Sequence, residues 1–410
     1  MQVIVMNSTC PYFIVAVVSD EKLNTGRSLT SPHFCLPVKK SAQPWQLLKG
    51  SPREERRLPG SHPYYIDSIQ GLSASLSSMR SPLLTFMVGR RSVVIGLIES
   101  ITLATACLPT AQAMSSGPSM KVIDSHLHVW ANTAESKEFP YLQDPPGDLR
   151  DEASISSLLQ QMDHNGVDGA LIVQPINHKF DHSYVLKAMK EHPDRFKGML
   201  LFDPSLDEEK AVSQLEELHR DGFVGVRFNP YLWPQLGEKS WSPMSQGVGL
   251  AVYRRCGELG MPVGIMCFQG LALHYDDILE LLKASPDTTM ILDHFGFTSV
   301  DKQDSFEQLL QLAKYPQVFV KVSAPFRLND SSPDFDQVQK RRFQPLLSAF
   351  GSERLLVGSD FPFVLQQSQA YGMLNTISTW IAADQDKKAI MGGTAEKLFG
   401  PWGVDATEKL

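Results

Sequence analysis

Between residues 121 and 402 the chain alternates two patterns of hydrophobic and polar positions. Short runs of apolar and β-branched residues, such as 318–323, are typical of strands that are buried on both faces. Between these runs, apolar residues recur with helical periodicity, as in 155–165. Strands are predicted at residues 121–130, 169–175, 196–204, 223–230, 262–268, 289–295, 318–323 and 354–359, and helices at 155–165, 182–191, 207–221, 249–259, 276–284, 305–314 and 334–349, with further helical sequence toward the C-terminus.

Eight strand–helix units in about 290 residues fit a closed barrel, for which about 250 residues are typical. A doubly wound open sheet usually has fewer strands and often carries a Gly-rich phosphate loop. No GxGxxG motif follows the first predicted strand. The sequence therefore predicts an α/β fold, a (β/α)₈ TIM barrel over residues 120–402.

The first 115 residues lack any sustained periodicity. They contain a serine-rich run at 73–78, scattered prolines and a basic cluster at Arg53, Arg56 and Arg57. Such a composition buries too little apolar surface to offset the entropy of ordering the chain. A hydroxylated, basic and acid-poor segment is typical of an organelle transit peptide. We therefore expect residues 1–115 to be a disordered targeting extension.

A second targeting pattern lies within this extension. The pair Arg90 and Arg91 precedes an apolar run at 93–108 and the sequence Ala-Gln-Ala at 111–113, the order of a twin-arginine signal with its cleavage site. The run is short for a membrane span and Glu99 interrupts it, so no span is expected in the mature form. The alternative is a short buried or amphipathic helix. The hypothesis is a chloroplast protein, with the thylakoid lumen as one possible destination; an erroneously extended gene model is the other explanation.

Charge and cysteine content support this division. The chain has 410 residues and a net charge of −7, which gives no basic surface for nucleic acid. Up to Ala113 there are 11 Lys and Arg against 6 Asp and Glu, or +5, which leaves −12 for the remainder. Of five cysteines the barrel region keeps Cys256 and Cys267, without a CxxC motif, and we expect buried reduced thiols. Composition gives no indication of the oligomeric state.

Polar residues stand where several predicted strands end. In a barrel of this type the active site lies at the carboxyl ends of the strands, so these residues are expected to converge on one mouth. They are His126 and His128 on the first strand, Arg227 and Asn229 on the fourth, Asp293 and His294 on the sixth, and Ser359 and Asp360 on the eighth, with Asp203 on the third as a weaker member.

The residue types indicate chemistry. Strand side chains alternate, so His126 and His128 point to the same side and are able to share a divalent cation or one substrate oxygen. A partly desolvated Asp360 is suited to act as a base. The guanidinium group of Arg227 is suited to bind a substrate carboxylate, and the alternative is an ordinary ion pair within the protein. For Asn229, substrate binding and packing are both open. The remaining helix and loop histidines are expected at the surface: His164, His178, His182, His192 and His219.

Four motifs together resemble a known family. They are Asp-Ser-His-Leu-His at 124–128, Gly-Val-Arg-Phe-Asn at 225–229, Leu-Asp-His-Phe-Gly at 292–296 and Gly-Ser-Asp-Phe-Pro at 358–362. In this order they resemble the amidohydrolase-related (amidohydrolase type 2) family, in particular its branch typified by 2-pyrone-4,6-dicarboxylate lactonase. The resemblance covers residues 120–400. It implies a barrel that hydrolyses lactones or related C–O and C–N bonds of small carboxylated substrates.

The resemblance also implies roles for matched residues. His126 and His128 match the first-strand pair, His294 the sixth-strand histidine and Asp360 the last-strand carboxylate, while Arg227 matches an arginine that meets a substrate carboxylate. Metal-binding relatives have a histidine at the end of strand five, where this chain has Met-Cys-Phe at 266–268. His274 comes too late to match it, and Cys267 is read as a buried thiol rather than a ligand. The cofactor is therefore either none or one zinc-like divalent metal held by His126, His128 and Asp360.

The resulting hypothesis is a lactonase in which Asp360 takes a proton from water and the three histidines polarise the carbonyl, alone or through a metal. Two alternatives remain: a metal-dependent decarboxylase of an unsaturated carboxylic acid, and a barrel that binds a small carboxylate without catalysis. Specificity is expected in the loops 130–148, 231–245 and 324–334. Candidates for the pocket wall are Trp130, Tyr231, Trp233 and Phe326.

Overall fold

The computed structural model describes residues 120–367 and 371–403, together with four short strands in the first hundred residues. The chain divides into two units, Met1–Met114 and Ser115–Leu410. The second unit contains every predicted site residue. None of the helices among the described residues has both the length and the apolar character needed to cross a membrane.

The first unit contains an antiparallel sheet in the order β1-β2-β4-β3. Its strands are β1 (Gln2–Met6), β2 (Ile14–Val18), β3 (Leu84–Val88) and β4 (Arg91–Leu97). Sequence analysis predicts no strand here because each apolar run is too short to show periodicity in a long window. β4 takes up the start of the apolar run 93–108, so a helix over that whole run is wrong. The 111–113 site lies outside the described residues, and targeting to the chloroplast stays a prediction.

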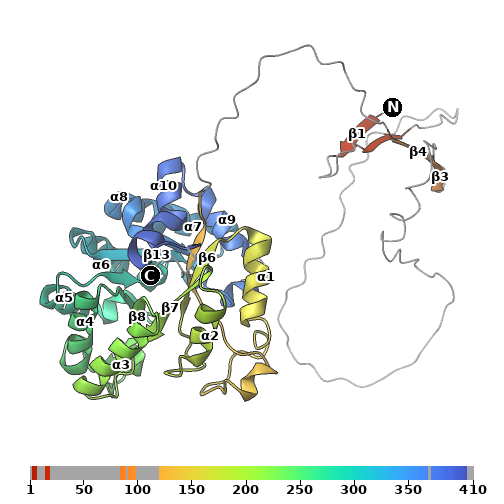
Figure 1. Cartoon of the computed structure of the whole chain (residues 1–410). Coiled ribbons are helices and arrows are strands. Elements are labelled where there is room, and N and C mark those ends of the chain that lie inside the picture. The colour runs from red at the N-terminus through yellow and green to blue at the C-terminus, as the bar shows by residue number, and fades with distance from the viewer. Residues whose placement is uncertain are drawn as a thin grey trace, which may run out of the picture. The chain divides into compact units, whose positions relative to one another are not determined.

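The second unit is a barrel of eight parallel strands (Figure 1). They are β5 (Ile123–Leu127), β6 (Gly169–Val173), β7 (Phe196–Leu201), β8 (Gly225–Phe228), β11 (Val263–Ile265), β12 (Met290–Leu292), β13 (Val318–Ser323) and β14 (Leu355–Gly358). Each pairs with the next in chain order. The segment after β14 closes the ring: the Asp360 amide donates to the His126 carbonyl at 2.8 Å, and the His128 amide to the Phe361 carbonyl at 2.7 Å. The predicted fold class is confirmed.

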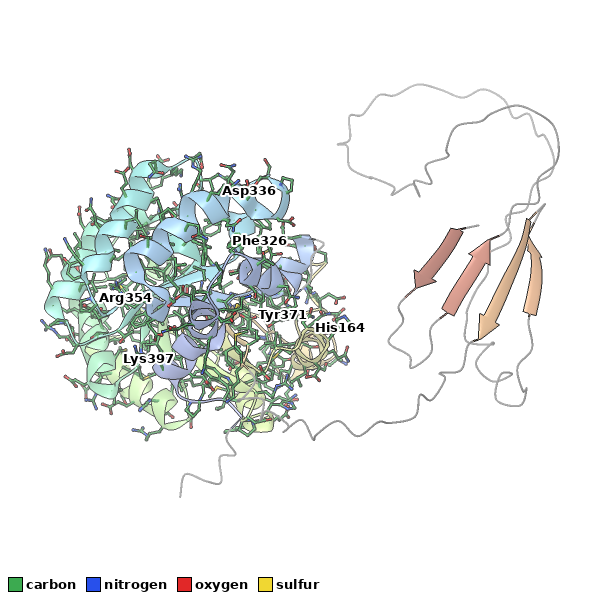
Figure 2. The ribbon with its side chains drawn as sticks, turned by 90° about the horizontal axis from the view of Figure 1, so that it is seen from above. His164, Phe326, Asp336, Arg354, Tyr371 and Lys397 are labelled. Carbon is green, nitrogen blue, oxygen red and sulfur yellow. The ribbon has the colours of Figure 1, made fainter. Side chains whose placement is uncertain are left out.

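Helices surround this barrel (Figures 1 and 2). Between the strands lie α1 (Ile155–Asn165), α2 (Ser183–Glu191), α3 (Glu208–Arg220), α4 (Gly247–Leu259), α5 (Tyr275–Ala284), α6 (Gln303–Gln311), α7 (Asp336–Val338) and α8 (Gln344–Phe350). After β14 follow α9 (Gly372–Thr379), α10 (Asp384–Lys388) and α11 (Thr394–Phe399). A two-stranded hairpin, β9 (Gln235–Gly237) with β10 (Ser240–Trp241), precedes α4.

Local sequence explains where these helices begin and end. Ser154 accepts the amide of Ser157 at the start of α1, and Asp207 accepts that of Lys210 at the start of α3. Gly260 has a φ of 69° at the end of α4, which is the left-handed conformation that glycine adopts most readily. These caps fix the lengths of the helices that pack against the strands.

Alternation along the strands separates two layers of core. One set of strand residues packs outward against the helices, and the other fills the barrel interior. In β13 the inward set is Phe319, Lys321 and Ser323, since Val318, Val320 and Val322 belong to the outer cluster. The inner layer is apolar toward the N-terminal ends of the strands and becomes polar toward their carboxyl ends.

Candidate active site

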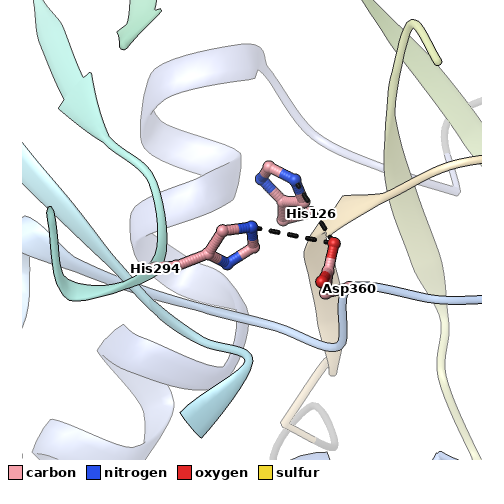
Figure 3. A group of neighbouring side chains, drawn as sticks. All are labelled: His126, His294 and Asp360. Atoms are coloured by element: carbon pink, nitrogen blue, oxygen red, sulfur yellow. Dashed lines mark ion pairs between the residues drawn. The ribbon is translucent and has the colours of Figure 1, made fainter. Parts of the chain in front are cut away.

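Four predicted residues meet at the carboxyl ends of the strands. His126 and His128 lie at the end of β5, His294 follows β12 and Asp360 follows β14. The distance from Oδ1 of Asp360 to the histidine Nε2 atom is 3.9 Å for His126, 3.6 Å for His128 and 3.7 Å for His294. All four side chains are buried. Figure 3 shows His126 and His294 converging on Asp360 from different strands. The structure therefore brings one carboxylate oxygen and three imidazoles together.

The backbone turns sharply after β12 and β14, at the residues that carry two of these side chains, His294 and Asp360. His294, Phe295 and Gly296 have φ values of 49°, 53° and 61°, and Asp360 has a φ of 62°. Non-glycine residues in this left-handed region are uncommon and cluster at functional sites. Because the chain leaves the sheet here, β12 ends at Leu292 and is shorter than predicted. The turn brings the imidazole of His294 close to Asp360, with Nε2 3.7 Å from Oδ1.

Two imidazoles are oriented by their second nitrogen. Nδ1 of His128 lies 2.8 Å from the carbonyl oxygen of Val173. A carbonyl only accepts, so Nδ1 of His128 carries a proton, and Nε2 is the nitrogen that faces Asp360. Nδ1 of His294 lies 2.7 Å from Oγ of Ser323, an inward residue of β13. Burial lowers the pKa of His294 to about 3, so its ring is neutral at physiological pH.

His126 belongs to a buried ionic network that the sequence analysis missed. Its Nδ1 lies 3.1 Å from Oδ1 of Asp293 and 3.1 Å from Nζ of Lys321. Lys321 Nζ is 3.3 Å from the same Asp293 oxygen, and Nη2 of Arg227 is 3.2 Å from the other. Although burial opposes ionisation, Lys321, His126 and Arg227 hold the pKa of Asp293 well below its usual range. A lysine inside an otherwise apolar strand was the signal available in the sequence.

Arg327 fixes the carboxylate of Asp360. Its Nε and Nη2 both lie 2.6 Å from Oδ2 of Asp360, which leaves Oδ1 directed at the imidazoles. Burial alone would raise the pKa of Asp360, but the positive charge of Arg327 is the largest of the effects that lower it well below its usual value. Asp360 is therefore a carboxylate. Arg327 lies in the loop 324–334 that was predicted to carry specificity, although the residue itself was not singled out.

A second buried carboxylate joins the first strand to the last. Asp124 accepts hydrogen bonds from the amides of His126 and Ser359 and from the hydroxyls of Ser359 and Tyr371. Burial raises the pKa of Asp124, while these donors lower it. The contacts hold the backbone of His126 against the turn that carries Asp360.

Three of the four side chains, His128, His294 and Asp360, border a cavity of about 410 Å³, lined also by Arg227, Asn229 and Arg327, while His126 lies behind them. Asn229 has a local role as well, because its Oδ1 accepts the amide of Tyr231. Of the predicted aromatic wall only Trp130 lines the cavity; Trp233 is buried against Phe202 and Phe228 instead. A hollow of about 420 Å³ around Lys121 and Trp402 contains none of these groups.

Two histidines expected at the surface are buried. The exposed fraction is 1% for His178 and 6% for His182. Nε2 of His178 accepts the amide of Ala131, and Nε2 of His182 accepts that of Leu201. They serve as hydrogen-bond acceptors for loop and strand backbone, a role that element assignment alone does not reveal. His164 is exposed on α1, as expected (Figure 2), and His192 and His219 are half-buried.

The cluster fits a divalent cation. Ligand atoms of His126, His294 and Asp360 all lie within 4.8 Å of one another. Nε2 of His126 is buried with no hydrogen-bond partner among the described residues. The Nε2–Oδ1 separations of 3.6–3.9 Å exceed a hydrogen bond and approach the edge of a zinc tetrahedron, roughly 3.4 Å. The sequence predicts His126, His128 and Asp360 as the metal ligands. In the structure, His294 also offers a ligand atom beside those of His126 and Asp360. Cys267 is buried and free, and burial raises its pKa, so it stays a thiol.

The chain was compared with known proteins. A family model described as amidohydrolase matches residues 123–400. A 4-sulfomuconolactone hydrolase of Hydrogenophaga intermedia is 25% identical over 290 residues, covering 68% of this chain and 88% of that protein. The same-named hydrolase of Rhizobium radiobacter is 29% identical over 246 residues, covering 58% and 75%.

Among solved structures, a Pseudomonas putida protein with the provisional name 2-pyrone-4,6-dicarboxylic acid hydrolase is similar in fold. It has a TM-score of 0.57 and 24% identity, and the match covers 68% of this chain and 98% of that one. The family model spans the whole barrel and all four motifs that carry the cluster. The chain belongs to the amidohydrolase family.

Proposed function

We propose that this barrel hydrolyses a lactone of a small carboxylated compound, using water activated by Asp360. The observation that carries the proposal is the state of Asp360: an ionised, buried carboxylate with one oxygen held by Arg327 and the other facing three imidazoles. Such an oxygen is an acceptor for the proton of a water molecule. The names of the two curated relatives support a lactone as the substrate.

The reaction follows from these positions. Asp360 accepts a proton from water as the water oxygen attacks the acyl carbon of the lactone. The ring C–O bond then breaks, and Asp360 returns the proton to the departing ring oxygen, which becomes a hydroxyl. Arg227 anchors the substrate carboxylate, because its Nε is buried without a partner among the described residues and borders the cavity. The products are one hydroxyl and one carboxylic acid on an open chain, and the acid releases the second proton of the water to solvent to become a carboxylate.

We further propose that the site works with one divalent cation. Nε2 of His126 is buried without a hydrogen-bond partner among the described residues and faces Oδ1 of Asp360 at 3.9 Å, a separation that suits two ligands of one ion. The residues that would hold the ion are His126, His294 and Asp360. When bound, a divalent cation polarises a carbonyl oxygen as a Lewis acid.

The variant Asp360→Asn tests the proposal. It keeps the shape of the side chain but removes the proton acceptor, and we expect turnover to fall by about 10²–10⁴-fold. Initial rates on a panel of lactones, followed with a pH indicator with and without chelator, give the measurement. Asp203→Asn is the matched control, since Asp203 also ends a strand but bonds only locally, to Ser205.

Full activity in Asp360→Asn would reject the role of this carboxylate. Turnover of no lactone by the folded wild type, with small carboxylates still bound, would favour the non-catalytic alternative instead. Carbon dioxide release from an unsaturated acid in the metal-loaded protein would favour the decarboxylase.

A further inference from the structure

Aromatic rings flank the reacting groups of the cavity on two sides. Phe363 packs edge-to-face on His128 and on Trp130, with ring centroids 6.0 Å apart in each case. Phe297 packs in the same way on His294 at 5.0 Å, and Phe268 on Phe297 at 5.7 Å. Trp130, Phe268, Phe297 and Phe363 all line the cavity. A substrate group that extends from the reacting carbonyl therefore meets aromatic surface on either side.

Phe268 marks the outer end of this surface. It remains 56% exposed at the carboxyl end of β11, whereas Phe297 is only 8% exposed. Large apolar side chains that remain exposed inside a cavity gain from being covered by an apolar ligand. Ile176 and Met266 add apolar surface to the cavity lining, which also includes the polar amides of Gln143, Gln174 and Asn177.

The charges of the cavity are almost balanced. Its charged lining residues are Arg227, Arg327 and Asp360. Arg327 is committed to Asp360 and Arg227 to Asp293, while Lys321 faces Asp293 from the other side. Without a bound cation, these five groups carry one positive charge in excess. A cation held by His126, His294 and Asp360 would act on the reacting carbonyl, so the charge that remains for other groups of a ligand is that of Arg227.

Asp124 is the other buried carboxylate near this network. An ionised Asp124 would add a negative charge and so reduce the excess of positive charge. Beyond the reacting carbonyl, the cavity therefore neutralises at most one anionic group of a ligand. A second buried carboxylate would have no partner, and an unpaired buried charge is costly.

We propose that the substrate is a lactone that carries a single carboxylate and an aryl substituent, and that the aryl ring packs against the aromatic side chains Phe268, Phe297 and Phe363, with the fully buried Trp130 behind Phe363. This deepens the proposed lactone hydrolysis and rests on it. Arg227 pairs with the single carboxylate. The substrate differs in charge from a dicarboxylic acid, the compound class in the name of the Pseudomonas putida protein.

The test uses the full chain and three matched lactones, which share one ring and one carboxylate and differ at a second position in phenyl, hydrogen or carboxylate. The corresponding lactams serve as binding probes in titration calorimetry because they resist hydrolysis. We expect kcat/KM for the phenyl compound to exceed that of each other compound by about tenfold or more, with the same order in lactam affinity.

Variants of Phe268 sharpen the comparison. Phe268→Ser should remove most of the preference for phenyl over hydrogen. Phe268→Arg supplies a second positive charge at the cavity edge and should shift the preference toward the dicarboxylate. Leu236→Ser and Leu236→Arg are the controls, since Leu236 is 68% exposed on the β9 hairpin and does not line the cavity. Both positions are exposed, so all four variants should fold, as thermal unfolding will verify.

The outcomes separate the two proposals. Equal or better binding of the dicarboxylate lactam by the wild type, no binding of any lactam, or an unchanged preference in Phe268→Arg overturns the substrate class. Binding of the phenyl lactam without turnover of any lactone leaves the substrate class standing and rejects hydrolysis. Best turnover of the dicarboxylate lactone rejects the substrate class and leaves hydrolysis standing.

Discussion

Lys321 illustrates how a single side chain shapes the site without reaching the cavity. It is fully buried on the inward face of β13, between Phe319 and Ser323. Burial lowers its pKa, and the charge of Asp293 raises it again. Its ammonium contacts both Asp293 and Nδ1 of His126, so it helps to fix the ring whose Nε2 faces Asp360. We regard it as a positioning residue.

Lys321→Met keeps the length of the side chain and removes the charge. We expect kcat to fall by about 10- to 100-fold, the usual effect of losing a residue that orients a ligand or catalytic ring, with KM and lactam affinity nearly unchanged. Steady-state kinetics and calorimetry give the split between kcat and KM. Lys388→Met, at an exposed position of α10, is the control. Equal losses of kcat and binding would indicate a merely structural role.

The residues that could be predicted from sequence share a feature that Lys321 lacks. His126, His128, His294 and Asp360 stand at predicted strand ends, where the fold alone assigns them to the mouth. Lys321 lies within an apolar strand, and only the register of the closed barrel shows that it faces inward. Arg327 reaches Asp360 through a loop whose conformation, with Ala324 at a φ of 47°, local sequence does not specify.

At the scale of elements, periodicity located all eight barrel strands and the helices between them. The strand ends were less predictable. The structure ends β12 at Leu292 because the next residues enter the left-handed region to present His294. The predicted helix 334–349 is interrupted by a π-helical turn at Gln339–Phe343 between α7 and α8. The hydrophobic pattern indicates which residues are buried. Because residues in such turns are buried as well, the pattern predicts strands and helices that are longer than those observed.

The contact between β5 and the turn after β14 provides a test at this scale. Asp124→Ala removes the acceptor of two buried amides, those of His126 and Ser359. Leaving them unpaired should lower the free energy of unfolding by about 2–5 kcal/mol and reduce turnover, because His126 and Asp360 share this contact. Tyr371→Phe removes one hydroxyl donor and should cost only about 1 kcal/mol. Urea unfolding measures both; equal stability of Asp124→Ala and wild type would contradict this account.

At the scale of the whole molecule, buried histidines outside the catalytic cluster tie stability to pH. Burial lowers the pKa of His182 to about 4, and the pKa values of His178 and His274 are lowered in the same way. In the unfolded chain these groups take up protons below about pH 6.5. Between that pH and the lowered pKa the unfolded state binds more protons, so the free energy of unfolding falls as the pH falls.

For His182 the loss should reach about 1.4 kcal/mol per pH unit between about pH 6 and its folded pKa of about 4. Urea unfolding at several pH values measures the slope. His182→Gln keeps a hydrogen-bond acceptor for the amide of Leu201 and should reduce the slope by that amount, which separates the histidine from the carboxylates. An identical slope in the variant would show that His182 is not neutral in the folded state.

The nearly balanced charge of the cavity also bears on how a turnover ends. Opening the ring converts an uncharged ester into a second carboxylate, so a singly charged substrate leaves as a doubly charged product. Arg327 is held by Asp360, and Arg227 already pairs with the carboxylate that the substrate brings, so neither neutralises the newly formed group. Only a cation at His126, His294 and Asp360 would attract it, so accumulated product should inhibit the metal-free enzyme weakly and the metal-loaded enzyme more strongly.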